Sequence, residues 1–136
     1  MDTIICEFDS NIKVYYTNRR KTLPIAYREE VKKHWEELVS SGKKFFNGDV
    51  FTIDSIKVEE NEAEIFVALT DYAHFLYTIH KSTHEPYDCR VIHTSVLIVT
   101  SDNKFAIGEM NEGTTFPYKL QFIGGGIDKK DIKGKN

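Results

Sequence analysis

The prediction of fold rests on one stretch, Lys119-Leu-Gln-Phe-Ile-Gly-Gly-Gly-Ile-Asp128, followed directly by Lys129-Lys-Asp131. Apolar residues at Leu120 and Phe122, with Ile123 next, predict a short strand, and the three glycines predict that it ends in a loop. Glycine lets backbone amides and carbonyls come close to a ligand, because no Cβ stands in the way. A glycine loop followed by carboxylates is suited to phosphate and divalent-metal chemistry.

Residues 122–131 resemble the opening of the Nudix box, whose pattern is G-x5-E-x7-R-E-U-x-E-E-x-G-U. Gly125 matches the first glycine of that pattern, and Asp131 stands, after five intervening residues, where the family has Glu. Ile123 replaces a frequent proline. The rest of the pattern, including its R-E-U-x-E-E helix, would fall beyond Asn136. We therefore expect these 136 residues to hold only the start of a Nudix domain.

This resemblance implies a hydrolase that acts on nucleoside diphosphate-linked substrates. Water would attack the pyrophosphate, and Mg²⁺ or Mn²⁺ would offset the charge that develops on the phosphates. The resemblance implies a box loop made of Gly124, Gly125, Gly126 and Asp128, with the Gly124 backbone carbonyl as a metal ligand and Asp131 bonding back into the loop. Because the family's other metal ligands would follow Asn136, we expect this chain alone to be inactive and to bind no metal tightly.

Composition is that of an ordinary soluble domain, with 136 residues, 40% of them hydrophobic and 29% charged. A net charge of −3 argues against a nucleic-acid partner, which usually requires a basic protein. No apolar run is long enough to predict a membrane span, and the amino terminus does not resemble a signal peptide. Two widely spaced cysteines, Cys6 and Cys89, predict reduced thiols and a cytoplasmic protein.

Residues 1–88 predict an amino-terminal α+β segment. Alternation of apolar and polar residues predicts a hairpin over 3–16 and a second hairpin that joins 50–58 to 63–69. Helical periodicity predicts a helix over 24–41, and Asp71 predicts the cap of a shorter helix that follows it. The apolar stripe expected on the long helix comprises Ile25, Val31, Trp35, Leu38 and Val39.

A basic loop is predicted over residues 17–21, between the first hairpin and the long helix. Its cations, Arg19, Arg20 and Lys21, would attract phosphate if they gather as an anion patch. The same composition is also that of a solvated loop, so the sequence leaves both interpretations open.

By the same resemblance, residues 89–136 are expected to form the start of the Nudix domain, a mixed-sheet α/β/α sandwich. The nearly continuous β-branched run over 91–100 is typical of a central strand that is buried on both faces. A tight turn over 101–104 and a return strand over 105–110 are expected to follow it. Open sheet edges would allow a homo-oligomer.

Two other hypotheses remain open at this point. The chain can be a non-catalytic α+β module that binds a nucleotide or a protein, with the anion patch as its contact. It can also be an interaction domain unrelated to Nudix proteins, in which the glycines belong to a tail.

Overall fold

The protein has an α+β fold, seen in a computed structural model that describes residues 11–81 and 85–133. The chain divides into two units, Met1–Val91 with Asp128–Asn136, and Ile92–Ile127. The first arm of the hairpin predicted over 3–16 lies outside the described residues. Within the described ranges, no helix is long and apolar enough to cross a membrane.

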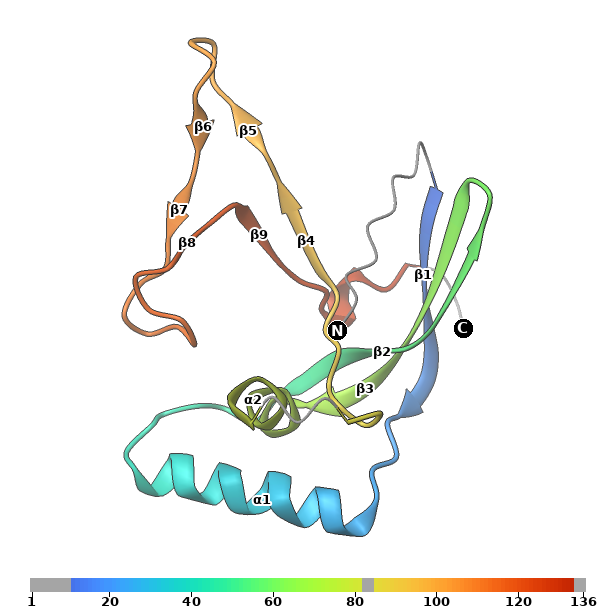
Figure 1. Cartoon of the computed structure of the whole chain (residues 1–136), viewed down its shortest axis with the longest axis vertical. Helices are drawn as coiled ribbons and strands as arrows, with labels where there is room; N and C mark the ends of the chain where they lie inside the picture. Colours follow the sequence, from blue (N-terminus) through green and yellow to red (C-terminus); the bar gives the residue numbers. More distant parts are fainter. Residues whose placement is uncertain (1–10, 82–84, 134–136) are drawn as a thin grey trace. The chain divides into compact units, whose positions relative to one another are not determined.

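The first unit is built on a three-stranded mixed sheet of β1 (Asn11–Arg20), β2 (Asp49–Glu59) and β3 (Glu62–Asp71), in the order β1-β3-β2. The predicted hairpin of β2 and β3 is confirmed, and β1 lies parallel to β3. Figure 1 shows the three strands side by side.

The basic loop predicted over 17–21 is wrong, because β1 continues through Arg20. The backbone of β3 supplies partners for this polar stretch. The Thr17 hydroxyl donates to the carbonyl of Val67 at 3.0 Å, and Lys21 N donates to the carbonyl of Leu69 at 2.7 Å. The register shifts between Tyr16 and Arg20, so the strand is bulged where the sequence predicts a loop.

Two helices complete the first unit, α1 (Ile25–Ser40) and α2 (Tyr72–Lys81), and both agree with the sequence prediction. α2 contacts β2 and β3, and α1 lies against α2 (Figure 1). The predicted cap of α2 is confirmed, since the Asp71 carboxylate accepts a hydrogen bond from His74 N at 2.9 Å.

The core of the first unit lies between these helices and the sheet. Leu76 is 0% exposed, and Val67 and Ala68 of β3 are each 2% exposed. The predicted stripe on α1 is partly wrong, because Ile25 and Val39 are exposed. The side chains of α1 that are buried are Tyr27, Val31 and His34. They keep the helical spacing that a one-sided core requires. The prediction listed only apolar residues, so it omitted the two buried side chains that carry polar atoms.

Residues 88–91 pack onto the first unit as an added edge to β2. Ile53 N donates to the carbonyl of Arg90 at 2.7 Å, and Arg90 N donates to the buried Thr52 hydroxyl at 3.0 Å. Cys89 is buried between β2 and α2, where its N–H donates to the hydroxyl of Thr78. Burial raises the pKa of the Cys89 thiol to about 12, so the thiol stays protonated and unreactive near neutral pH.

The second unit consists of short strand pairs. β4 (His93–Val96) pairs with β9 (Ile123–Gly126), β5 (Ile98–Val99) pairs with β6 (Phe105–Ala106), and β7 (Gly108–Glu109) pairs with β8 (Leu120–Gln121). All three pairs are antiparallel.

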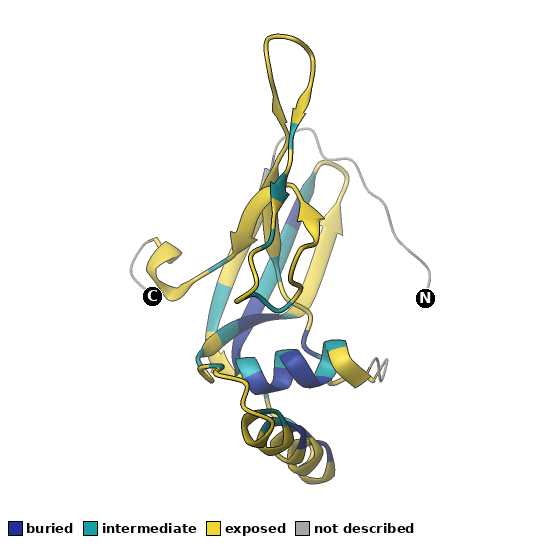
Figure 2. Cartoon of the chain, turned by 90° about the vertical axis from the view of Figure 1, so that its left-hand side faces the viewer, coloured by how far each residue is buried: buried dark blue, intermediate teal, exposed yellow. Residues whose placement is uncertain are grey.

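The predicted tight turn of the second unit is confirmed, with the left-handed residue Asn103 at a φ of 57°. The prediction of a strand over 91–100 that is buried on both faces is wrong. β4 and β5 are exposed along their whole length, because no second layer within this unit covers them. Figure 2 shows that the buried residues lie in the first unit, and no residue from 92 to 127 is buried.

Two buried histidines make the stability of the first unit sensitive to pH. His74 is 1% exposed, and its Nδ1 lies 2.8 Å from the Thr70 hydroxyl. His34 is also buried, and its Nε2 lies 2.9 Å from Nδ1 of His80. Burial is the main cause that lowers the pKa of both His34 and His74 below the ordinary value of 6.5. For His34, the nearby His80 and Lys81 lower the pKa further.

We therefore expect thermal stability to fall as the pH is lowered below the ordinary histidine pKa, at about 6.5. In that range the unfolded chain binds protons that the folded chain excludes, so protonation favours unfolding. Above that pH His34 and His74 are neutral in both the folded and the unfolded chain, so protonation no longer lowers the stability of the folded state. The measurement is the melting temperature between pH about 8 and pH about 5. His74→Gln should reduce the steepness of the fall, whatever its effect at pH about 8. A melting temperature that rises on acidification would contradict this assignment.

Candidate functional site

Residues 122–131, here called the box segment, contain three glycines that do not form a loop. Gly124, Gly125 and Gly126 lie in β9 and pair with Ser95, Thr94 and His93 of β4. The predicted glycine loop is therefore wrong, because the backbone of β4 offers these three residues an antiparallel partner.

Only one of these glycines is required by close approach. A Cβ on Gly124 would lie 2.1 Å from the Thr94 carbonyl oxygen and 2.7 Å from Ser95 Cα, which no side chain can tolerate. A Cβ on Gly125 would meet nothing within 4 Å, and one on Gly126 would make only an ordinary contact with the Ile92 carbonyl. Gly124, the residue whose carbonyl the resemblance assigns to a metal, is thus the position where β9 most needs glycine.

The two carboxylates of the box segment form a tight turn in the first unit. Asp128 caps the 3₁₀ turn η1 (Lys129–Asp131), and its carboxylate accepts from Lys130 N at 3.4 Å. In return, the Asp131 carboxylate accepts from Asp128 N at 2.9 Å. This reciprocal arrangement is a capping box, a local signal that starts a helical turn. Asp131 thus bonds back to Asp128, and its role in place of the family's Glu stays a prediction.

The carboxylate of Asp49 ties this turn to the sheet. It accepts from the Arg20 guanidinium at 2.7 Å and also pairs with the Lys129 ammonium. Hydrogen bonds from Lys129 and then from Arg20 lower the pKa of Asp49, so it stays ionised at neutral pH. The sequence analysis missed Asp49, and no spacing rule connects it to a residue so distant in the chain.

The predicted anion patch is occupied by carboxylates of the protein itself. Arg19 pairs with Asp54 at 3.0 Å, and Lys21 pairs with the same carboxylate at 3.1 Å. Arg20 pairs with Asp49. The three cations lie at the end of β1 and do gather in space, and each of them is paired with either Asp49 or Asp54.

A hollow of about 360 Å³ lies beside this patch, between the end of β1 and the start of α1. Its lining includes the cations Arg20, Lys21 and Arg28, together with Thr22 and the carboxylate of Asp71. Among the described residues, the Arg28 side chain makes no ion pair. The sequence analysis missed Arg28. The signal that could have identified it is its place in the first turn of α1, because the helix dipole disfavours a cation at that end of a helix.

The part of the chain that the structure describes contains no group of three or more His, Cys, Asp or Glu side chains that could hold a metal ion. No protein-family model matches this chain, and none of the curated proteins matches it significantly.

Removal of the Asp131 carboxylate should destabilise the capped turn of residues 128–131 without affecting the core. We expect Asp131→Ala to speed hydrogen exchange at the amide of Asp128 by ~5-fold, equivalent to about 1 kcal/mol, because that amide loses its acceptor. Exchange measured by NMR checks this, with Lys133→Ala as the matched exposed control. Asp131→Glu, the residue of the family pattern, should keep the protection. Equal exchange rates in all three variants would show that the capping box does not form in solution.

Proposed function

We propose that this chain contains the amino-terminal part of a Nudix-type hydrolase, which acts on nucleoside diphosphate-linked substrates. The observation that carries the proposal is the capping box of Asp128 and Asp131. It starts a helical turn directly after the glycine strand in the sequence, which is the order that the Nudix box resemblance implies.

Each part of the box segment supports a positioning role. Gly124 allows β9 to approach β4 closely, which supports an ordered rather than a flexible glycine segment. Asp131 holds the first turn through Asp128 N, and Asp49 holds the same turn through Lys129. A segment that is fixed at several points can orient the groups that follow it for reaction.

The hydrolysis would consist of attack by water on a phosphorus of the pyrophosphate. A bound Mg²⁺ or Mn²⁺ would offset the negative charge that develops on the phosphate oxygens. The described donors do not by themselves fit such an ion, because no three His, Cys, Asp or Glu side chains among the described residues gather around one point. A hard dication needs several further oxygen ligands.

We therefore expect residues 1–136, incubated with Mg²⁺ and a nucleoside diphosphate sugar, to release no product above a blank without protein. The physical reason is the incomplete set of oxygen donors. Product release can be followed by phosphate or nucleotide chromatography. Turnover that chelation of the metal abolishes would contradict this expectation.

The proposal itself is tested by the coding sequence that follows the Asn136 codon. A reading frame that continues into Arg-Glu and Glu-Glu pairs at box spacing would support it. The chain extended through those residues should then hydrolyse the same substrate, and Asp131→Ala should reduce kcat. A stop codon after Asn136 would overturn the hydrolase proposal.

A second candidate function is nucleotide binding without catalysis. The observation that favours it is the hollow beside α1, where Arg28 lacks an ion pair among the described residues and Arg20 and Lys21 stand nearby. Guanidinium groups bind phosphate oxygens in a forked geometry, and a nucleoside diphosphate carries such oxygens.

If the hollow binds nucleotides, a nucleoside diphosphate should raise the melting temperature in the absence of metal, by mass action. Arg28→Gln should abolish the shift, because it removes the lining cation that makes no ion pair with any described residue. Arg19→Gln is the matched control, since Arg19 is already paired with Asp54. No shift at millimolar nucleotide would contradict the binding function and leave the hydrolase proposal to its own test.

A further inference from the structure

The strand edge over residues 91–100 carries an inference that does not depend on the proposed hydrolase. Within the described residues, β4 pairs only with β9 and β5 pairs only with β6. Each of these strands therefore has one edge whose backbone N–H and C=O groups have no strand beside them. An open edge of this kind can pair with another strand.

The composition of this stretch leaves the edge unprotected. Residues 91–100 contain no Lys, Arg, Asp, Glu, Pro or Gly. Proteins usually prevent edge pairing with charges, proline or bulges. Four consecutive apolar side chains stand exposed: Val96, Leu97, Ile98 and Val99. A continuous exposed apolar run on an extended β-branched strand is the pattern expected at an interface.

The other open edges of the chain differ in ways that disfavour self-pairing. β1 carries Lys13, Arg19 and Arg20, and β2 carries charges of both signs. β9 is uncharged, but three of its four residues are glycine, which weakens a strand. The edge of β4 and β5 thus combines strong β-formers with the absence of charge.

We propose that this edge pairs with the same edge of a second copy of the chain. In a two-fold antiparallel pairing centred on the apolar run, residue i lies opposite residue j and residue j lies opposite residue i, so only residues near the axis lie close to their own counterparts, and a charge there would meet a like charge. Residues 91–100 contain none of the four charged residue types and meet this requirement. The apolar run of one copy would then lie beside the run of the other and remove both from water.

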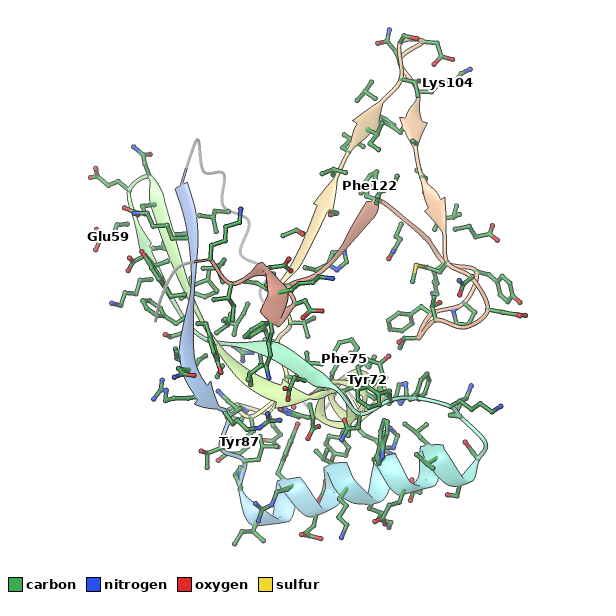
Figure 3. All side chains as sticks on the ribbon, turned by 180° about the vertical axis from the view of Figure 1, so that it is seen from behind. Glu59, Tyr72, Phe75, Tyr87, Lys104 and Phe122 are labelled. Carbon is green, nitrogen blue, oxygen red and sulfur yellow. The ribbon has the colours of Figure 1, made fainter. Side chains whose placement is uncertain are left out.

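Further apolar side chains stand exposed elsewhere in the second unit. Phe122 and Leu120 are exposed and line a hollow of about 360 Å³ together with His93 and Ser95 from β4. Figure 3 shows Phe122 on this unit beside β4, and Lys104 at the turn that joins β5 and β6.

The test is the oligomeric state of residues 1–136, measured by sedimentation velocity over a concentration series. We expect a reversible dimer, and we expect Leu97→Lys to raise its dissociation constant by ~100-fold through like-charge repulsion across the two-fold axis. Ile56→Lys is the matched control, because Ile56 and Leu97 are both 54% exposed and Ile56 lies on β2. The control variant should dimerise as the unchanged chain does.

A mixing experiment separates self-pairing from a general loss of apolar surface. Leu97→Lys and Leu97→Asp should each be monomeric alone and should form a heterodimer when mixed, because opposite charges then meet. Isotope-filtered NOEs between copies should connect residues 93–99 in the unchanged dimer. A chain that is monomeric at every concentration, a dimer that Leu97→Lys leaves intact, or variants that stay monomeric when mixed would each overturn the proposal.

Discussion

The amino end of α2 is the constraint on which the first unit depends. Tyr72 N donates to the Gly48 carbonyl at 2.9 Å, Ala73 N donates to the Asn47 side chain at 2.8 Å, and His74 N donates to the Asp71 side chain. A helix leaves its first N–H groups without intrahelical partners, and these three bonds satisfy them. Since Asn47 and Gly48 lead into β2 and Asp71 ends β3, the helix is fixed to both strands of the hairpin.

The rest of the core follows from this anchoring. With α2 held at its start, Leu76 and His74 are fully buried, and Tyr77 meets Tyr27 of α1 in an edge-to-face contact with ring centroids 5.3 Å apart. The Tyr27 hydroxyl also donates to the Asp88 carboxylate at 2.8 Å, which holds residues 88–91 near the helices. The hydrogen bonds at the amino end of α2 therefore fix the position of a helix whose contacts join residues that are distant in the sequence.

The sequence predicts the parts of this fold that depend on neighbours along the chain. The hairpin of β2 and β3, the extent of α1 and the Asp71 cap all follow from local periodicity and capping chemistry. The parallel pairing of β1 with β3, the extended glycines beside β4 and the link from Asp49 to Lys129 depend on partners far away in the chain. No spacing rule reports such partners, so Thr17 to Arg20 and the glycines were both assigned to loops. The prediction that residues 91–100 are buried on both faces was wrong for a related reason. Hydrophobicity indicates which residues a strand could bury, but it does not indicate whether another layer covers them.

The uneven distribution of buried residues has a consequence for calorimetry. The heat-capacity change of unfolding is set by the apolar surface that becomes exposed. All of the buried residues that the structure describes belong to the first unit, while residues 92–127 contain none. The heat-capacity change and the denaturant dependence of unfolding of the monomer should therefore be those of a domain markedly shorter than the chain. Their size would report how many residues take part in the cooperative transition.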